Sequence, residues 1–229
     1  MSRPLEPVGG PLGSVEQLAP GRAEATREAL LRAAGQQFAA EGYHGASLTK
    51  ILERVGVTKG ALYFHFPSKK ALAEALLAET VRRKRDGYAA ACVLAADPLT
   101  ALIAGVDAVV QLSVHDPVVR GGNQLLDDPM VATVHARDNY SSAQGLLRRH
   151  LEDAAALGLL RPEADPASIA ASMTAAIAGH RLICERADTL EELPVRISTM
   201  WRMTLPLITA DTPVAARFRT APGSPPSPR

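Results

Sequence analysis

Residues 48–66, which read LTKILERVGVTKGALYFHF, constrain the fold of this chain more than any other segment. Apolar side chains recur there at the spacing i, i+3, i+4, i+7, namely at Leu48, Ile51, Leu52 and Val55. That spacing gives a short helix one buried face. Gly56 follows, where a left-handed backbone ends a helix at low cost, and Thr58 can cap a second helix. The segment therefore predicts two short helices joined by a tight turn.

The second helix begins with two residues that oppose helix stability. Gly60 costs about 1 kcal/mol relative to Ala inside a helix, and Lys59 places a cation at the positive end of the helix dipole. Both choices make sense if a phosphate backbone approaches, because Gly removes a Cβ from the contact and Lys attracts the anion. Such local conflicts are expected at functional sites. The composition therefore indicates a helix-turn-helix that binds nucleic acid.

The next helix repeats this pattern. Pro67 ends the preceding helix, Ser68 can cap the next one, and Lys69 and Lys70 fill its first turn. Two cations there are unfavourable by roughly 0.3–1 kcal/mol each, and a bound phosphate would reverse the sign. Two solvated lysines are the alternative, but their place beside Lys59 favours phosphate contact.

A preceding helix over residues 22–42 completes the N-terminal unit. The expected three-helix core consists of Phe38, Ile51, Val55, Ala61, Leu62 and Phe66. Residues 21–70 carry eight Lys and Arg against four Glu, so the segment has a net charge of +4, whereas the whole chain has +1. This asymmetry predicts that a polyanion binds to the N-terminal part of the chain.

The stretch GYHGASLTKILERVGVTKGALYFHFPSKKALAEALL resembles the N-terminal signature of the TetR family of bacterial transcriptional repressors. The TKGALYFHF form, with DPVVRGG at residues 116–122, is most similar to the γ-butyrolactone autoregulator receptors of actinomycetes. The resemblance implies an all-α chain of about nine helices. The first three would bind a palindromic DNA operator, and the others would form an effector pocket and a dimer interface. Effector binding would release the operator.

The resemblance also implies a set of DNA contacts. By motif position, the family's usual contacts fall on Thr58, Lys59, Gly60, Tyr63, His65 and Lys69. Ser47, Thr49 and Lys50, at the start of the preceding helix, are further candidates. Thr58 and Lys59, with Lys50, are the candidates for contact with base edges. Phe64 stands where many members have a second Tyr, so a hydrogen bond is lost there.

Composition and turn signals divide the chain into four parts. Residues 1–20 and 211–229 are rich in Pro and Gly and are expected to be disordered tails. Residues 21–67 would form the helix-turn-helix domain, and residues 68–210 a helical effector-binding and dimerisation domain. Asp-Pro pairs at residues 97–98, 116–117, 128–129 and 165–166 predict helix starts. Gly87 and the pair Gly121-Gly122 are expected to interrupt helices.

A basic cluster, residues 82–85, lies on the helix that joins the two domains. A solvated or internally paired face is favoured over a DNA contact. Tilting this helix would change the separation of two recognition helices, which a dimer must hold near ~34–36 Å or a multiple of it.

Two later segments, residues 167–187 and 190–208, are apolar on more than one side. A helix of this kind is buried on two sides. One side would face the subunit's own core, and the other the same helices of a second copy, giving a homodimer. A monomer with a thick core is the alternative.

The middle helices are expected to enclose a pocket for a small apolar effector. The candidate residues are Val109, Leu112, Gln124, Leu125, Val131, Val134, Tyr140, Leu147, Met173, Ile177 and His180. Each of them could instead be an ordinary core residue. Tyr140 stands where butyrolactone receptors usually carry a Trp, and the only Trp of this chain, Trp201, lies far later. This departure leaves the effector open, with a γ-butyrolactone or butenolide as the first hypothesis.

The sequence contains no pattern typical of catalysis. We expect no enzyme activity, no cofactor and no metal site, because nucleophile elbows, phosphate loops and clustered His or Cys ligands are missing. Cys92 and Cys184 are expected to be free thiols of a cytoplasmic protein. No apolar run approaches the ~20 residues that a membrane span needs. The prediction is a repressor; the alternatives are a helical carrier or enzyme with a vestigial helix-turn-helix, and an effector-independent DNA binder.

Overall fold

The computed structural model describes residues 20–128, 131 and 135–210. The two predicted tails and the pocket candidate Val134 lie outside these residues, apart from Pro20. The helices are α1 (Pro20–Gly45), α2 (Leu48–Val55), α3 (Lys59–His65), α4 (Lys69–Cys92), α5 (Pro98–His115), α6 (Pro117–Leu126), α7 (His135–Ala156), α8 (Pro166–Arg186) and α9 (Leu193–Ile208). A 3₁₀ turn, η1 (Leu190–Glu192), precedes α9. The described residues form no strand beyond an isolated bridge between Leu160 and Thr209, which confirms the all-α prediction.

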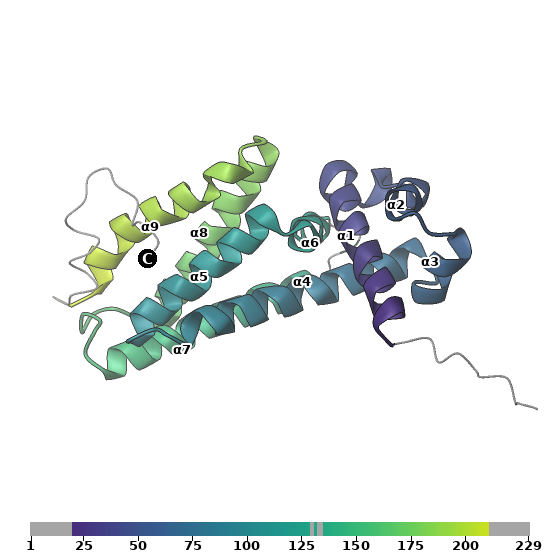
Figure 1. Ribbon diagram of the computed structural model, residues 1–229. Helices are drawn as coiled ribbons and strands as arrows, with labels where there is room; N and C mark the ends of the chain where they lie inside the picture. The colour runs from purple at the N-terminus through teal and green to yellow at the C-terminus, as the bar shows by residue number, and fades with distance from the viewer. Residues whose placement is uncertain (1–19, 129–130, 132–134, 211–229) are drawn as a thin grey trace, which may run out of the picture.

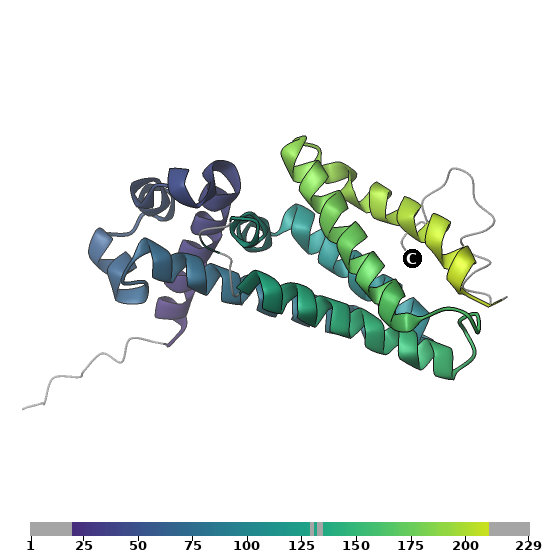
Figure 2. The same cartoon turned by 180° about the vertical axis from the view of Figure 1, so that it is seen from behind.

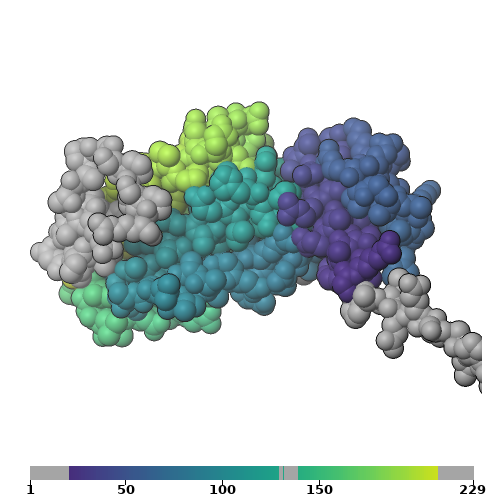
Figure 3. Space-filling view, in the orientation of Figure 1, coloured from purple at the N-terminus to yellow at the C-terminus, as the bar shows by residue number. Residues whose placement is uncertain are grey.

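The molecule is elongated, and α4 runs along most of its length (Figure 1). Helices α1–α3, which we call the N-terminal unit, lie at one end of α4. Helices α5, α7, α8 and α9 gather around the other end, with α6 between the two groups (Figures 1 and 2). The space-filling view shows the N-terminal unit protruding from the rest of the molecule (Figure 3). Its surface is therefore open to a large partner.

Three of the four Asp-Pro pairs start helices, as predicted; the fourth pair, at residues 128–129, includes Pro129, which lies outside the described residues. The Asp97 side chain accepts a hydrogen bond from the backbone N–H of Thr100. The Asp116 side chain accepts from the backbone N–H groups of Val118 and Val119. The Asp165 side chain accepts from those of Ala167 and Ser168. In each case Pro occupies the first turn, where its missing N–H costs nothing. These caps fix where α5, α6 and α8 begin.

The molecule contains two hydrophobic cores. The first joins the N-terminal unit to the first half of α4 and to α6, with Phe38, Leu76 and Leu125 among its buried residues. The second lies among α4, α5, α7, α8 and α9 and contains Trp201, which is 1% exposed. The first core thus extends beyond residue 67, and α6, far along the sequence, belongs to it.

The glycines expected to interrupt helices do not do so. Gly87 lies inside α4, and Gly121 and Gly122 lie inside α6. Their role is close packing, because a Cβ on Gly121 would come within 2.4 Å of the Gly35 backbone oxygen, and one on Gly122 within 1.9 Å of the Thr80 hydroxyl. Glycine therefore allows α6 to cross α1 and α4 at a distance that no larger residue permits.

Two helices, α5 and α8, are long and apolar enough to cross a membrane by length and composition alone. The expectation that no apolar run approaches this length was therefore wrong. Helix α5 contacts α4, α6, α7 and α9, and α8 contacts α7, η1 and α9. Buried residues make up 39% of the apolar window in α5 and 22% of that in α8, so protein neighbours cover these two helices only in part.

Candidate nucleic-acid interface and internal cavity

The turn between α2 and α3 has the predicted geometry. Gly56 adopts a left-handed conformation at φ 73° and its N–H closes α2 on the carbonyl of Leu52. The Thr58 side chain accepts a hydrogen bond from the backbone N of Ala61, which caps α3. Ile51 and Leu62 anchor the two helices in the first core at 1% and 0% exposure. The opposite faces of α2 and α3 are free to meet a ligand.

Helix α3 exposes the side chains that the sequence assigned to DNA. Thr58, Lys59 and Gly60 are exposed, and Lys59 Nζ lies 5.8 Å from the centre of the Tyr63 ring. Tyr63 is 41% exposed and Phe64 80%. A cation beside a phenol offers a phosphate both charge and a hydroxyl donor. His65 is half-buried and packs edge-on against Phe64, so its ring is less accessible to a partner than Lys59 or Tyr63.

The start of α2 adds polar groups to the same surface. Ser47 has the backbone conformation of an N-cap, but its side chain makes no capping hydrogen bond. Thr49 and Lys50 are exposed, and Lys50 Nζ lies 2.7 Å from the Glu41 carboxylate at the end of α1. This ion pair lowers the pKa of Glu41. Lys50 is thereby held in place, with its charge partly compensated.

Lys69 is used differently from Lys59. Its Nζ donates to the carbonyls of Ala46 at 2.6 Å and His44 at 3.3 Å, and lies 5.0 Å from the Tyr43 ring centre. Burial lowers the pKa of Lys69. The side chain therefore ties the loop before α2 to α4. Because an ammonium group carries three donors, one remains for a phosphate.

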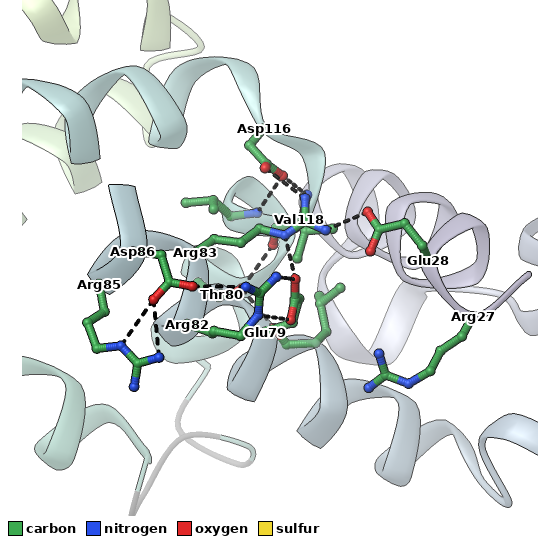
Figure 4. Close-up of polar contacts among 12 residues, drawn as sticks. Arg27, Glu28, Glu79, Thr80, Arg82, Arg83, Arg85, Asp86, Asp116 and Val118 are labelled. Carbon is green, nitrogen blue, oxygen red and sulfur yellow. Dashed lines mark hydrogen bonds and ion pairs between the residues drawn. The ribbon is translucent and has the colours of Figure 1, made fainter. Parts of the chain in front are cut away.

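Arg83 joins the N-terminal unit to the rest of the molecule (Figure 4). Its guanidinium pairs with Glu28 of α1, Glu79 of α4 and Asp116 at the start of α6. Hydrogen bonds from Arg82 and Arg83 lower the pKa of Glu79 to about 2, against the cost of burial. Arg82 and Arg85 pair with Asp86. The basic cluster is thus internally paired, as favoured from the sequence, and three of its four members meet carboxylates.

A cavity of about 730 Å³ lies among α4, α5, α7 and α8. Four of the predicted pocket residues line it: Val109, Tyr140, Leu147 and Ile177. Its wall is mostly apolar, with hydroxyl groups from residues such as Tyr88, Ser113 and Thr174. Its size and lining suit a small amphipathic molecule.

The other predicted pocket residues are elsewhere. Met173 lines a smaller hollow of about 310 Å³ between α8 and α9. Leu125 is buried in the first core, Gln124 is exposed, and Leu112 lies against Gly87. Val131 packs on the first core. His180 is half-buried, and its Nδ1 is buried without a hydrogen-bond partner among the described residues. None of these six lines the cavity.

The sequence analysis missed the charged residues of the cavity. These are all cations, namely Lys84, Arg85, Arg149 and Arg181. Arg181 is 7% exposed and pairs with Asp127 at 3.0 Å and with Glu185 at 2.6 Å. It also donates to the Tyr140 hydroxyl. The available signal was a charged residue, Arg181, inside the apolar segment 167–187, since a buried arginine there needs a partner.

Lys84 lies on the wall of the cavity and is half-buried. Its Nζ donates to Asn123 Oδ1 at 2.6 Å, which links α4 to α6. Burial lowers the pKa of Lys84 to about 7, and the neighbouring Arg181 cation lowers it further. Asn123 is fully buried, and its Nδ2 has no hydrogen-bond partner among the described residues. This pair places a polar contact between α4 and α6 beside the cavity.

Helices α8 and α9 leave apolar side chains uncovered. Ile183, Val195, Met203 and Leu207 are 55–73% exposed. Apolar surface of this kind on neighbouring helices is typical of an interface between proteins.

Fold and site together define a class of protein: an exposed helix-turn-helix unit fused to a helical domain with an internal cavity. Two family profiles match this chain, "Bacterial regulatory proteins, tetR family" over residues 30–76 and "Tetracyclin repressor-like, C-terminal domain" over residues 96–209. The chain belongs to the TetR family of bacterial regulatory proteins.

Individual relatives narrow this further. The chain is 31% identical over 191 residues to the A-factor receptor protein of Streptomyces griseus; the match covers 82% of this chain but 65% of that protein, just under two thirds of its length. A solved structure that describes the control of antibiotic production by bacterial hormones has a TM-score of 0.74 and 32% identity. The match covers 81% of this chain and 98% of the chain in that structure. CprB from Streptomyces coelicolor, in complex with its operator sequence, has a TM-score of 0.72 and 29% identity, covering 87% and 95%.

Proposed function

We propose that this protein is a transcriptional repressor that binds a palindromic DNA operator and is released from it by a small, largely apolar effector. The observation that carries the proposal is the coexistence of two sites in one chain. The exposed polar face of α2 and α3 suits duplex DNA, and the cavity among α4, α5, α7 and α8 suits a small molecule. The likeness to the A-factor receptor and to the CprB–operator complex supports both halves.

The same proposal includes a homodimer formed through α8 and α9. The exposed Ile183, Val195, Met203 and Leu207 would be covered by the same surface of a second copy. A dimer presents two copies of α3, which is what a palindromic operator requires. Size-exclusion chromatography with light scattering tests this directly, because Val195→Glu with Met203→Glu should give a monomer, whereas wild type stays dimeric at micromolar concentration. A wild-type monomer would contradict the proposal.

Helices α4 and α6 would carry the signal from the cavity to the DNA. Helix α4 contributes Lys84 and Tyr88 to the cavity wall and also packs in the first core through Leu76. Helix α6 makes the most extensive contact with α1, and Arg83 joins α1, α4 and α6. A ligand that moves α4 against α6 would therefore tilt the N-terminal unit. In a dimer that tilt changes the separation of the two α3 helices.

Gel-shift titration tests the function. Duplex fragments tiled across the DNA flanking the gene should include one that binds specifically, in the presence of excess unrelated duplex, and a neutral apolar lactone such as γ-decalactone serves as a first release probe. Absence of a specific complex with every fragment at low salt, with ligand binding intact, would favour the carrier or enzyme alternative. Operator binding that no apolar probe or culture extract weakens would favour the effector-independent DNA binder.

The remaining expectations belong to this proposal. A regulator of this kind works where the chromosome is, in the cytoplasm, and needs neither catalysis nor a cofactor. Within the described residues there is no group of three or more His, Cys, Asp or Glu side chains that could hold a metal ion. Cys92 and Cys184 are free thiols, which agrees with a reducing compartment.

A further inference from the structure

Among the residues that the structure describes, every charged side chain on the cavity wall is a cation. Lys84 and Arg85 come from α4, Arg149 from α7 and Arg181 from α8. The nearby carboxylates of Asp127 and Glu185 both pair with Arg181 and do not line the cavity. Arg181 is buried and Lys84 half-buried, whereas Arg85 and Arg149 are exposed. A cation that apolar walls shield from water favours an anion over a neutral molecule of the same size.

We propose that the effector of this protein is an apolar molecule carrying one carboxylate, which Lys84 binds inside the cavity. This inference rests on the proposed function, since it assigns the ligand class of the same site. It differs from the neutral lactone that the family resemblance suggests.

Lys84 and Asn123 have unused donors at the same point. Lys84 Nζ donates one hydrogen bond, to Asn123 Oδ1, while Asp127 and Glu185 act on it only at longer range. An ammonium group therefore has two donors left. The buried Nδ2 of Asn123 sits on the same amide group and has no partner among the described residues. A carboxylate accepts several hydrogen bonds at once, so one bound in the cavity would use the free donors of Lys84. Asn123 itself is fully buried and does not line the cavity.

The surroundings of Lys84 make binding depend on pH. The charged and titratable groups around it are Arg85 and Tyr88 on α4, Asp127 after α6, Tyr140 and Arg149 on α7, and Arg181 and Glu185 on α8. Helix α5 contributes Ser113 and apolar side chains to the cavity wall. With a pKa lowered to about 7, Lys84 is largely neutral above that pH in the empty protein. A bound carboxylate favours the charged form, so its binding takes up a proton.

The same contact would transmit the effect of the ligand. Lys84 ties α4 to α6 through Asn123, and α6 packs against α1 at Gly35 and Gly121. A carboxylate that draws Lys84 away from Asn123 loosens α4 from α6, next to the Arg83 junction.

Calorimetry with a matched pair of probes tests the proposal. The full-length protein is titrated with decanoate and with its methyl ester at pH 6.5 and pH 8.5. Decanoate should bind more tightly than the ester at pH 6.5, and its affinity should fall by up to about 25-fold at pH 8.5 as Lys84 loses its proton. The ester should show no such change. Titration in buffers of different ionisation enthalpy at pH 7.5 should show net proton uptake with decanoate and none with the ester.

Two variants sharpen the result. Lys84→Met keeps the length of the side chain and should abolish both the preference for the acid and the proton uptake. Arg148→Met removes an exposed cation that pairs with Glu152 at 2.7 Å and does not line the cavity, and it should behave as wild type. The proton-uptake measurement uses the wild-type protein, so the proposal can still be tested if Lys84→Met fails to fold.

Three outcomes would overturn the inference: equal affinity for acid and ester, an acid preference that persists in Lys84→Met, or no binding by any straight-chain acid from hexanoate to tetradecanoate. Operator binding by the same samples is measured separately. Release by γ-decalactone but by no acid would overturn this inference and leave the proposed function intact, whereas the absence of operator binding would count against the proposed function.

Discussion

The N-terminal unit and the cavity handle charge in opposite ways. Lys59 stands in water on the surface of α3, whereas Arg181 is enclosed by α7 and α8 and paired with two carboxylates. An exposed charge costs little to keep and adds little to stability, so it is available for a partner. A buried charge must be paired, and its loss leaves the partners without compensation. A basic side chain such as Lys59 is therefore available for a partner, whereas Arg181 is part of the architecture.

Lys69 stands between these two cases. It belongs to the N-terminal unit's surface by sequence, but its ammonium group holds two carbonyls of the loop before α2. The following substitutions test whether exposure, and not residue type, decides what each basic side chain does.

The largest effect is expected for Arg181→Leu. The change leaves Asp127 and Glu185 without their cation, and should cost about 3–5 kcal/mol in the free energy of unfolding at pH 7. The deficit should shrink at pH 5, because burial raises the pKa of Glu185, and this carboxylate regains stability by taking up a proton once its cation is gone. Urea denaturation measures both. The matched control is Arg196→Leu, whose exposed pair with Glu192 is an i, i+4 contact worth about 0.5 kcal/mol or less. Equal losses in the two variants would contradict the comparison.

Gly121→Ala comes next and tests the junction between the two regions. Its Cβ would meet the Gly35 backbone at 2.4 Å, so α6 must move away from α1, at a cost of about 1–3 kcal/mol. Thermal unfolding measures the loss. Gly145→Ala in α7 is the control, since nothing lies within 4 Å of its Cβ and Ala should stabilise that helix by about 0.5–1 kcal/mol. A neutral Gly121→Ala would mean that α1 and α6 are not tightly joined.

A smaller effect on stability is expected for Lys69→Met. The substitution removes two hydrogen bonds to the carbonyls of His44 and Ala46, and should cost about 1–2 kcal/mol. Lys70→Met, its exposed neighbour, loses only a 3.8 Å contact with Glu74 and should change stability by less than about 0.5 kcal/mol. Urea denaturation distinguishes them. If Lys69→Met unfolds like wild type, its carbonyl contacts add nothing and phosphate contact becomes its main role.

The smallest effect on stability, and a clear one on DNA, is expected for Lys59→Met. Stability should change by less than about 0.5 kcal/mol, because the side chain is exposed. The dependence of operator affinity on salt should flatten by about one unit per subunit, since one phosphate contact is lost. Fluorescence anisotropy across a salt series measures the slope. An unchanged slope and affinity would place the DNA on another surface.

Local sequence determined much of this protein. The spacing of Leu48, Ile51 and Val55, the left-handed Gly56 and the capping Thr58 act over a few residues, so the helix-turn-helix could be predicted from the sequence and was confirmed. The Asp-Pro helix starts are local for the same reason. The long apolar segments predicted the helices that now carry the uncovered face of α8 and α9.

Only the tertiary structure decided which distant residues meet. Lys84, the stretch from Asn123 to Asp127, and Arg181 are far apart in sequence, and no periodicity of one helix shows that they meet beside a cavity. Gly121 and Gly122 carry the signal of a helix break, yet the approach of α1 and α4 turns them into contact points inside a helix. Helical periodicity predicts which face of a helix is buried, but only the packing of the helices determines which residues that face contacts.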